Sequence, residues 1–369
     1  MQDDGGTLHA KGLPATMIII VIIVTCIWSV MVIAPKHKTF SYRVQRIALA
    51  LSVAVTAAML AWSVGSRRVP PEASDLAPIW ASARAWLHHQ DPYDAVGPGR
   101  WFVTVFPQIY PMTAIITVAP LALIPLRWAD ALFVGLGFGL FTWAVTTKRL
   151  LTPVVIALVS LGALMAIQTS QWSLLLTGAA LVPGFGWLLI AKPTVGLALF
   201  AAFPRWKTAI GCGMFFLLAT LLWPEWITEW RATLASAPHV IPPITRTVGP
   251  FVLLALVKWR RADARLLVAL ACVPHTTAPY ETIPLFLIPQ TWLQACGLWA
   301  LALLAYVAQW MNGPYASQGA YWASGAEWIV ALMYLPCLAM VLCRPNVWPQ
   351  AESSDQVSAA AQLLVTAVN

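Results

Sequence analysis

The chain has 369 residues, of which 60% are hydrophobic and only 10% are charged. Its mean hydropathy of +0.74 excludes an ordinary water-soluble domain. The net charge of +8 comes from basic residues in short stretches between apolar segments, a membrane-topology pattern that gives no support for a nucleic-acid partner. The sequence contains no Walker, GxGxxG, HExxH or CxxC motif, so nucleotide chemistry has no support either.

Six apolar segments come close to the length of roughly 18 to 20 residues that crosses a bilayer core. These segments are 15–34, 47–65, 128–147, 150–167, 291–310 and 326–343. Shorter apolar pieces, broken by Pro and Gly, lie around 173–203, 208–223, 247–257 and 266–290. We therefore expect an all-α, polytopic integral membrane protein with about ten to twelve transmembrane or partial helices in one domain, 1–345, followed by a cytoplasmic tail, 346–369.

Basic residues form four clusters, at 36–46, 148–149, 205–207 and 258–265. The positive-inside rule places all four on the cytoplasmic side, with the C-terminus inside and the outer loop 66–127 outside. The Pro-bounded piece 109–126 must then be a re-entrant or partly buried helix pair, because a full crossing would put Lys148 and Arg149 on the wrong side. Irregular backbone at membrane depth is tolerated only beside protein or a water-filled cavity.

The segment 74–93, SDLAPIWASARAWLHHQDPY, is polar and acidic in an otherwise apolar chain. Four of the 14 acidic residues gather in and beside it: Glu72, Asp75, Asp91 and Asp94. Apolar residues at helical spacing over 74–89 predict an amphipathic helix at the outer membrane interface, and DPYD predicts a turn. Asp75, where this helix begins, is either an N-cap, a role that Ser74 could also take, or a carboxylate base kept ionised by the helix N-terminus.

Three further polar groups interrupt apolar sequence. Residues 168–172, QTSQW, form either an ordinary loop or part of a site. Lys192 has apolar residues on both sides, and burying an unpaired ammonium costs at least about 2.5 kcal/mol. It either snorkels to the cytoplasmic interface or holds a phosphate. His275, Tyr280 and Glu281 form the third group, for which a structural histidine is the alternative to a role in a site.

Several motifs follow one another in a particular order over about 47–210. They are DLAPIWASARAW with Asp75, the turn Asp91-Pro92-Tyr93, the Pro-rich hairpin from Tyr110-Pro111 to Pro125 with LRWADALF after it, SQWSLL at 170–175 and the pair Lys192-Pro193. In this order they resemble the polyprenol-phosphate-mannose-dependent mannosyltransferases of the GT-C superfamily, glycosyltransferase family 87. The chain differs from the family at Ser170, where Gly is usual, at Met112, where a second Pro is common, in a shorter 180–203 region and in an additional helix at 15–34.

The resemblance implies a GT-C-type fold and the transfer of a hexose, expected to be mannose, from a polyprenyl-phosphate sugar to a glycan or glycolipid acceptor. Such a transfer inverts the configuration at the sugar and takes place at the extracytoplasmic face of the plasma membrane, expected here to be bacterial. By the resemblance Asp75 deprotonates the acceptor hydroxyl. One carboxylate suffices for this chemistry, because a phosphate leaves without a protein acid.

The resemblance also implies roles for the polar residues around Asp75. Lys192 and Arg84 would neutralise the departing phosphate. The remaining residues expected to bind the donor or substrate are Tyr93, Tyr110, Gln171, His275, Tyr280 and Glu281.

The alternative function is a lipid-linked sugar transporter or flippase without catalytic activity, for which the broken 173–203 region would suit discontinuous helices. The sequence shows no internal inverted repeat, which argues against it. A structural membrane partner is the third interpretation, and it would need neither Asp75 nor Lys192. No metal site or other cofactor is predicted, and a divalent cation is left open. The expected partners are the donor, the acceptor and membrane lipids.

Overall fold

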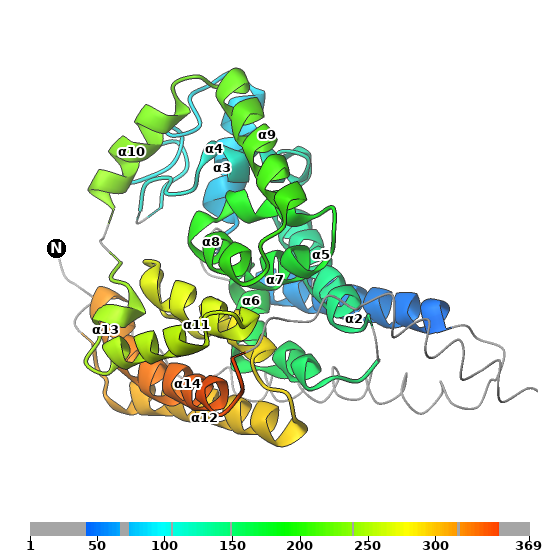
Figure 1. The fold of residues 1–369 in the computed structure, drawn as a ribbon. Coiled ribbons are helices and arrows are strands. Elements are labelled where there is room, and N and C mark those ends of the chain that lie inside the picture. The colour runs from blue at the N-terminus through cyan, green and yellow to red at the C-terminus, as the bar shows by residue number, and fades with distance from the viewer. Residues whose placement is uncertain are drawn as a thin grey trace, which may run out of the picture.

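A computed structural model describes residues 42–66, 74–104, 106–147, 150–237, 240–315 and 318–346. Every regular element in these ranges is a helix, which confirms the all-α prediction (Figure 1). The expected first helix at 15–34, the acid Glu72, the basic pair Lys148 and Arg149, and all but the first residue of the 346–369 tail lie outside the described residues.

Four helical segments among the described residues are long and apolar enough to cross a membrane. They are α2 (Tyr42–Gly65), α5 (Leu126–Val145), α12 (Trp292–Met311) and Ala323–Leu342, which runs through α13 (Gln318–Ile329), η8 (Val330–Tyr334) and α14 (Leu335–Leu342). α9 (Trp206–Leu222) and α10 (Trp226–Ser236) make a fifth candidate, bent by 96° at the break between them. These segments support an integral membrane protein.

The helices between these spans are shorter. Apart from the two helices within 150–169 described below, they are α3 (Ala77–Leu87), α4 (Met112–Val118), η2 (Leu121–Leu123), α7 (Ser173–Leu181), η4 (Gly186–Ala191), α8 (Pro193–Ala202), η5 (Pro243–Thr245), η6 (Gly249–Lys258), α11 (Ala262–Cys272) and η7 (Pro279–Leu287). Residues 109–126 thus form two short helices, α4 and η2, and no crossing helix, as the topology prediction requires.

One expected span is wrong. Residues 150–167 do not form a continuous helix but break into η3 (Pro153–Val159) and α6 (Leu161–Thr169). Ser160 stands between them with an extended backbone, and its Oγ accepts a hydrogen bond from the amide of Ala163 at 3.2 Å. A serine in this conformation caps a new helix and ends the preceding one.

α2 and α5 form an antiparallel pair, and an arginine stacks on a tryptophan at each end of the pair. The guanidinium carbon of Arg46 lies 3.6 Å from the ring centroid of Trp143, and that of Arg127 lies 3.5 Å from the ring centroid of Trp62. Sixteen residues separate the two stacks on each helix, which corresponds to about 24 Å. Arg and Trp at such spacing are suited to anchoring a span at the two membrane interfaces.

Glycines set the distance between α5 and its neighbours. A Cβ added to Gly139 would lie 2.9 Å from the Cβ of Ala54 in α2, and one added to Gly178 of α7 would lie 2.8 Å from the backbone nitrogen of Phe141. Small residues at helix interfaces let the backbones approach closely, which is a main source of packing energy where no water is displaced.

α7 runs in the same direction as α5 and begins partway along it. Gly137 lies against Leu175, and four residues earlier Phe133 packs edge-on against Trp172, with ring centroids 4.9 Å apart. Phe133 is seven residues, or about 10 Å, from the start of α5. Residues at the start of α7 therefore lie level with the interior of a candidate span.

Basic residues gather at the ends of α5, α7 and α8. Arg46 donates to the carbonyl of Trp143 near the end of α5, Arg205 to the last carbonyls of α7, and Arg265 to the last carbonyls of α8. Because α5 and α7 are parallel, Arg46 and Arg205 lie at the same end of the molecule. Arg205 follows the end of α8 by only three residues, so Arg265 lies at this end too. These three residues, each from a different predicted basic cluster, thus lie as a common membrane side would require.

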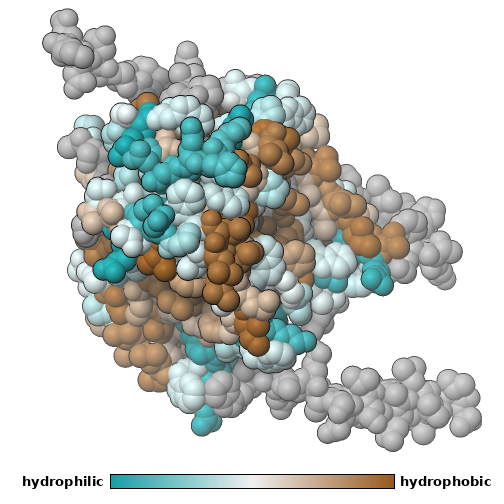
Figure 2. Space-filling model, turned by 90° about the horizontal axis from the view of Figure 1, so that it is seen from above, coloured by the Kyte–Doolittle hydropathy of each residue, from teal (hydrophilic) through white to brown (hydrophobic). Residues whose placement is uncertain are grey.

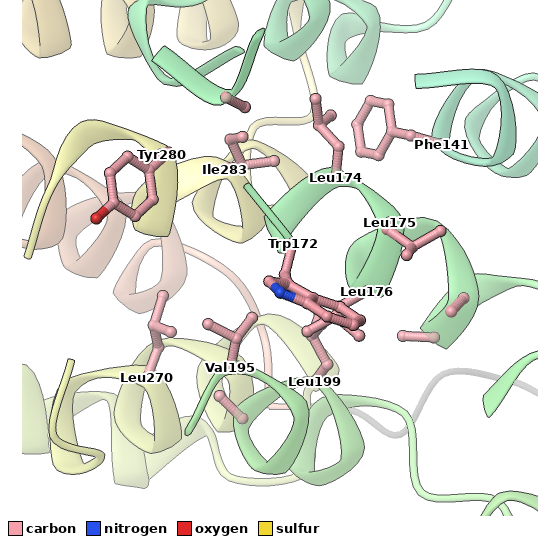
Figure 3. Close-up of a cluster of buried hydrophobic side chains, with 14 of the residues drawn as sticks. Phe141, Trp172, Leu174, Leu175, Leu176, Val195, Leu199, Leu270, Tyr280 and Ile283 are labelled. Carbon is pink, nitrogen blue, oxygen red and sulfur yellow. The ribbon is translucent and has the colours of Figure 1, made fainter. Parts of the chain in front are cut away.

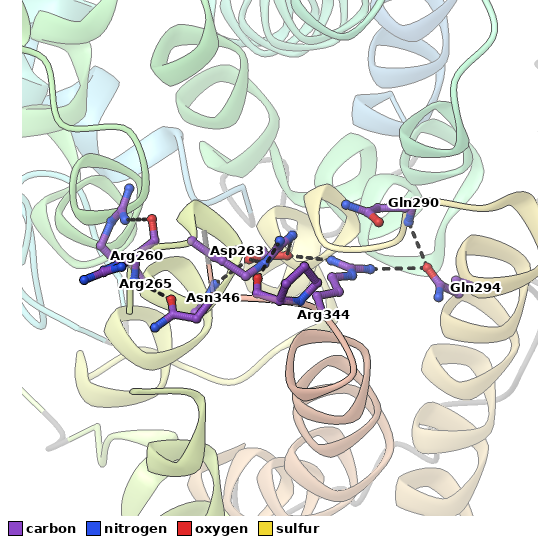
Figure 4. Close-up of polar contacts among 10 residues, drawn as sticks. Arg260, Asp263, Arg265, Gln290, Gln294, Arg344 and Asn346 are labelled. Carbon is purple, nitrogen blue, oxygen red and sulfur yellow. Dashed lines mark hydrogen bonds and ion pairs between the residues drawn. The ribbon is translucent and has the colours of Figure 1, made fainter. Parts of the chain in front are cut away.

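A polar network ties the last helix to the starts of α11 and α12 (Figure 4). Asp263 accepts hydrogen bonds from Arg261 at 3.0 Å and from Arg344 at 2.5 Å, and Arg344 also donates to Gln294 at 3.3 Å. All three charged side chains are largely buried. The network fixes the end of α14 against the body of the protein.

Large apolar side chains cover much of the surface. Leu51, Val55 and Met59 of α2 are between 56% and 67% exposed, and α9 presents Met214 and Leu221 in the same way. Seen from above, hydrophobic residues form continuous areas beside hydrophilic ones (Figure 2). Continuous apolar faces of this kind are expected where a protein meets lipid.

The helix expected at the membrane interface is packed inside the protein instead. α3 buries Ile79, Ala81, Ser82 and Ala85, which point in different directions around the helix. The indole of Trp80 donates to the carbonyl of Ile124 at 3.0 Å, which attaches α3 to the end of the hairpin. Alanine and serine let neighbouring segments approach α3 from several sides, so an amphipathic surface helix is the wrong description.

Candidate functional site

Asp75 lies between α2 and α3, and its neighbours fix its position. The Oγ of Ser74 accepts from the amide of Ala77 at 3.1 Å, so Ser74 supplies a cap at the start of α3. The amide of Asp75 donates to the carbonyl of Thr169 at 2.9 Å. The side-chain amide of Gln171 donates to the Asp75 carboxylate and also to Thr169 Oγ1, at 3.2 Å for the latter. The predicted acid and the predicted glutamine are therefore direct partners.

The turn after α6 positions Gln171 beside Asp75. Ser170 has a left-handed backbone, with φ of 57°, and ends α6. Gln171, Trp172 and Ser173 follow and lead into α7. A left-handed residue at a helix end favours glycine, which has no Cβ penalty there. This explains physically why glycine would suit position 170, while the backbone of this chain accommodates a serine.

Lys192 and Glu281 form a buried ion pair. Nζ of Lys192 lies 2.5 Å from Oε1 of Glu281, and the two side chains are 13% and 2% exposed. Lys192 precedes Pro193 at the start of α8, and Glu281 lies in the first turn of η7. The interpretation that Lys192 snorkels to the cytoplasmic interface is wrong, because its ammonium is buried against a carboxylate.

Two tyrosines flank this pair and connect it with Asp75. Nζ of Lys192 lies 6.0 Å from the ring centroid of Tyr110 and 5.8 Å from that of Tyr280. Burial raises the pKa of Tyr110 to about 12; the charge of Lys192 opposes this shift, and those of Asp75 and Glu281 add to it. Six of the predicted site residues therefore belong to one site: Asp75, Tyr110, Gln171, Lys192, Tyr280 and Glu281.

His275 borders the same site but uses its ring for internal hydrogen bonds. Nδ1 accepts from the amide of Thr277 at 3.2 Å, so the ring proton of the neutral form is on Nε2. Nε2 lies 3.1 Å from both the carbonyl of Leu270 and the hydroxyl of Tyr334. Burial lowers the pKa of His275 and favours this neutral form. The arrangement matches the structural histidine considered from the sequence.

Two predicted residues lie in other surroundings. Arg84 is near the end of α3, about 10 Å along the helix from Ala77, with its guanidinium carbon 4.9 Å from the Trp80 ring centroid. The backbone amide of Tyr93 is held in the predicted turn by Asp91 Oδ1, at 2.8 Å. Burial raises the pKa of Tyr93, and the charges of Glu229 and Asp91 add to this shift. Its hydroxyl is buried without a hydrogen-bond partner among the described residues.

Trp172 and Ser173 belong to the SQWSLL motif at 170–175, but the sequence analysis assigned neither of them a role. Trp172 is fully buried among apolar side chains such as Leu175 and Leu176 (Figure 3). Its ring centroid lies 4.9 Å from that of Phe133 and 6.3 Å from that of Tyr110. Its indole nitrogen and the Ser173 hydroxyl have no hydrogen-bond partner among the described residues. A tryptophan between apolar runs is typical of the hydrophobic core, and its position next to Gln171 was the only sequence signal for a role in the site.

Within the described ranges no group of three or more His, Cys, Asp or Glu side chains could hold a metal ion. No family model, curated protein or solved structure matches this chain.

Proposed function

We propose that the protein is a membrane glycosyltransferase with a GT-C-type fold, which moves a hexose, mannose by resemblance, from a polyprenyl-phosphate sugar to a glycan or glycolipid acceptor. The observation that carries the proposal is the convergence of two buried polar pairs, Gln171 with Asp75 and Lys192 with Glu281. Tyr110 joins them: its ring lies 6.3 Å from that of Trp172, the residue after Gln171, and 6.0 Å from Lys192 Nζ. Ionisable groups are costly at such a place and cluster where they serve a function.

The arrangement suits a single displacement. The acceptor hydroxyl gives its proton to Asp75, its oxygen attacks the anomeric carbon, and the bond from that carbon to the phosphate oxygen breaks with its electron pair on the phosphate. Gln171 holds the Asp75 carboxylate in one orientation. Lys192 has three N–H donors. Glu281 takes one and Tyr110 a second, so one is left for the leaving phosphate.

The position of the site supports an extracytoplasmic reaction. Trp172 precedes α7, and the basic residue Arg205 binds the far end of this helix, about 13 Å away. If the basic end faces the cytoplasm, as the positive-inside rule predicts, Asp75 and Gln171 lie toward the outer side.

The test uses membranes from cells with and without the protein, incubated with a polyprenyl phosphate carrying a radiolabelled sugar. A transferase produces a labelled glycan or glycolipid and releases polyprenyl phosphate. A transporter or flippase moves the labelled lipid between leaflets without breaking the sugar–phosphate bond. Movement of intact donor without product would replace the proposal by that alternative.

A further inference from the structure

Four buried polar atoms around the Asp75 site have no hydrogen-bond partner among the described residues. They are Gln171 Oε1, Trp172 Nε1, Ser173 Oγ and Glu281 Oε2. Trp172 and Ser173 are fully buried, and Gln171 and Glu281 are 4% and 2% exposed. An unsatisfied buried polar group costs about 1–3 kcal/mol, and native proteins keep few of them. Four in one region indicate groups held ready for a ligand.

The four atoms come from two segments that meet. Gln171, Trp172 and Ser173 lie at the start of α7, Glu281 lies in the first turn of η7, and α7 packs against η7. In Figure 3 the nitrogen end of the Trp172 indole points to the side of Val195 and Tyr280, while the opposite end of the ring lies toward Leu175. The indole N–H therefore faces the α8 and η7 side of the site, which carries Lys192 and Glu281.

Their chemistry selects the kind of ligand group. Gln171 Oε1 and Glu281 Oε2 are acceptors, Trp172 Nε1 is a donor, and the Ser173 hydroxyl is both. A phosphate offers acceptors almost exclusively, so it has no proton to donate to Gln171 Oε1 or Glu281 Oε2. A sugar ring carries several hydroxyls, each of which donates and accepts.

We propose that Trp172, Ser173 and the free oxygen of Glu281 form the part of the site that recognises the hydroxyls of the transferred sugar. This inference rests on the proposed function. The two carboxylate oxygens of Glu281 then have different roles. Oε1 positions Lys192 for the phosphate, and Oε2 accepts a hydrogen bond from the sugar. Trp172 becomes a specificity residue, since its N–H is the one donor among the four atoms that cannot also accept.

The test compares two soluble probes, a short-chain prenyl-phosphoryl mannose and the same prenyl phosphate without sugar, by calorimetric binding to the purified protein in detergent. Trp172→Phe keeps one aromatic ring and removes the indole N–H together with the area of the second ring. We expect the variant to lose about tenfold in affinity for the sugar-bearing probe, the value of one hydrogen bond, and none for the sugar-free probe. Ser173→Ala should shift the two affinities in the same unequal way.

Phe133→Leu is the matched control, because Phe133 packs on the same indole but carries no polar atom. It should leave the ratio of the two affinities unchanged. An equal loss for both probes in Trp172→Phe, or no loss for either, would overturn the recognition role while the wild-type binding still supports the proposed function. A wild-type protein that binds neither probe would overturn both proposals.

Discussion

Lys192 Nζ and Glu281 Oε1 lie 2.5 Å apart in a site where both side chains are almost fully buried, although 89 residues separate them in the sequence. A buried ion pair contributes little net stability, because both charges lose their hydration. Removing one partner is different, since it leaves a single charge without compensation. Variants that remove one partner or both partners of this pair can therefore distinguish an effect on stability from an effect on activity.

Glu281→Gln should destabilise the protein by about 3–5 kcal/mol, because it leaves the Lys192 ammonium buried and unpaired. The double variant Lys192→Met with Glu281→Met should recover most of this loss and yet fail to transfer sugar. Thermal unfolding in detergent, followed by circular dichroism, measures the first effect. Asp94→Asn is the control: the Asp94–Arg100 pair is more than half exposed on average, and its loss should cost at most about 1 kcal/mol. Single and double variants of equal stability would contradict the argument.

Gly178→Ala should disturb the site through packing alone. The added Cβ would lie 2.8 Å from the Phe141 backbone nitrogen, so α7 must move away from α5 and carry Gln171 with it. We expect a destabilisation of about 1–3 kcal/mol and a lower transfer rate. Gly213→Ala in α9 is the matched control, because nothing lies within 4 Å of its Cβ position and alanine favours a helix. Equal results for the two variants in unfolding and transfer assays would show that neither stability nor transfer depends on the close approach of α7 and α5.

The network at Asp263 should make stability depend on pH in acid. Burial acts to raise the pKa of Asp263, but the hydrogen bonds from Arg261 and Arg344 dominate and lower it below its ordinary value. A lowered pKa in the folded state stabilises the fold fully above the ordinary value of about 3.9, and this contribution is lost as pH falls through the folded value. Asp263→Asn should therefore melt below wild type near neutral pH, and the difference should shrink below about pH 3. A difference in melting temperature that does not change with pH would contradict this.

Cysteine labelling tests the orientation. Asp94 and Arg260 are exposed residues on the predicted outer and inner sides. In a variant without native cysteines, a cysteine at position 94 should react with a membrane-impermeant maleimide applied to intact cells, and one at position 260 only after permeabilisation. The thiol-free parent, which should not react, is the control. The opposite pattern would place the Asp75 site on the cytoplasmic side and remove the basis for a donor in the outer leaflet.

The long helices follow from hydropathy because each fills a membrane span by itself. The 47–65, 128–147 and 291–310 segments become α2, α5 and α12 with boundaries shifted by a few residues. The 150–167 segment fails because Ser160 caps a new helix there, a local preference that a hydropathy average hides. The prediction of an amphipathic surface helix at α3 is wrong for another reason. The small residues of α3 allow other segments to pack on several of its sides, and sequence periodicity does not show how many segments will do so.

The candidate site was predictable residue by residue but not as an assembly. Scarcity of polar groups in an apolar chain was enough to single out Asp75, Gln171, Lys192 and Glu281. Nothing local indicates that Gln171 reaches Asp75 or that Lys192 pairs with Glu281, because those contacts depend on how distant helices pack. Trp172 lies in the SQWSLL motif but received no role, because an indole carries no charge and the sequence does not show that its nitrogen is buried without a partner.

The measurement that tests the central proposal most directly is sugar transfer from a radiolabelled polyprenyl-phosphate sugar by membranes containing wild type, Asp75→Asn or Asp94→Asn. The amide of Asp75→Asn keeps the shape of the side chain but cannot take the proton of the acceptor. The account predicts transfer by wild type and by Asp94→Asn, and none above background by Asp75→Asn at equal protein level and equal melting temperature. Transfer by Asp75→Asn at the wild-type rate would contradict it.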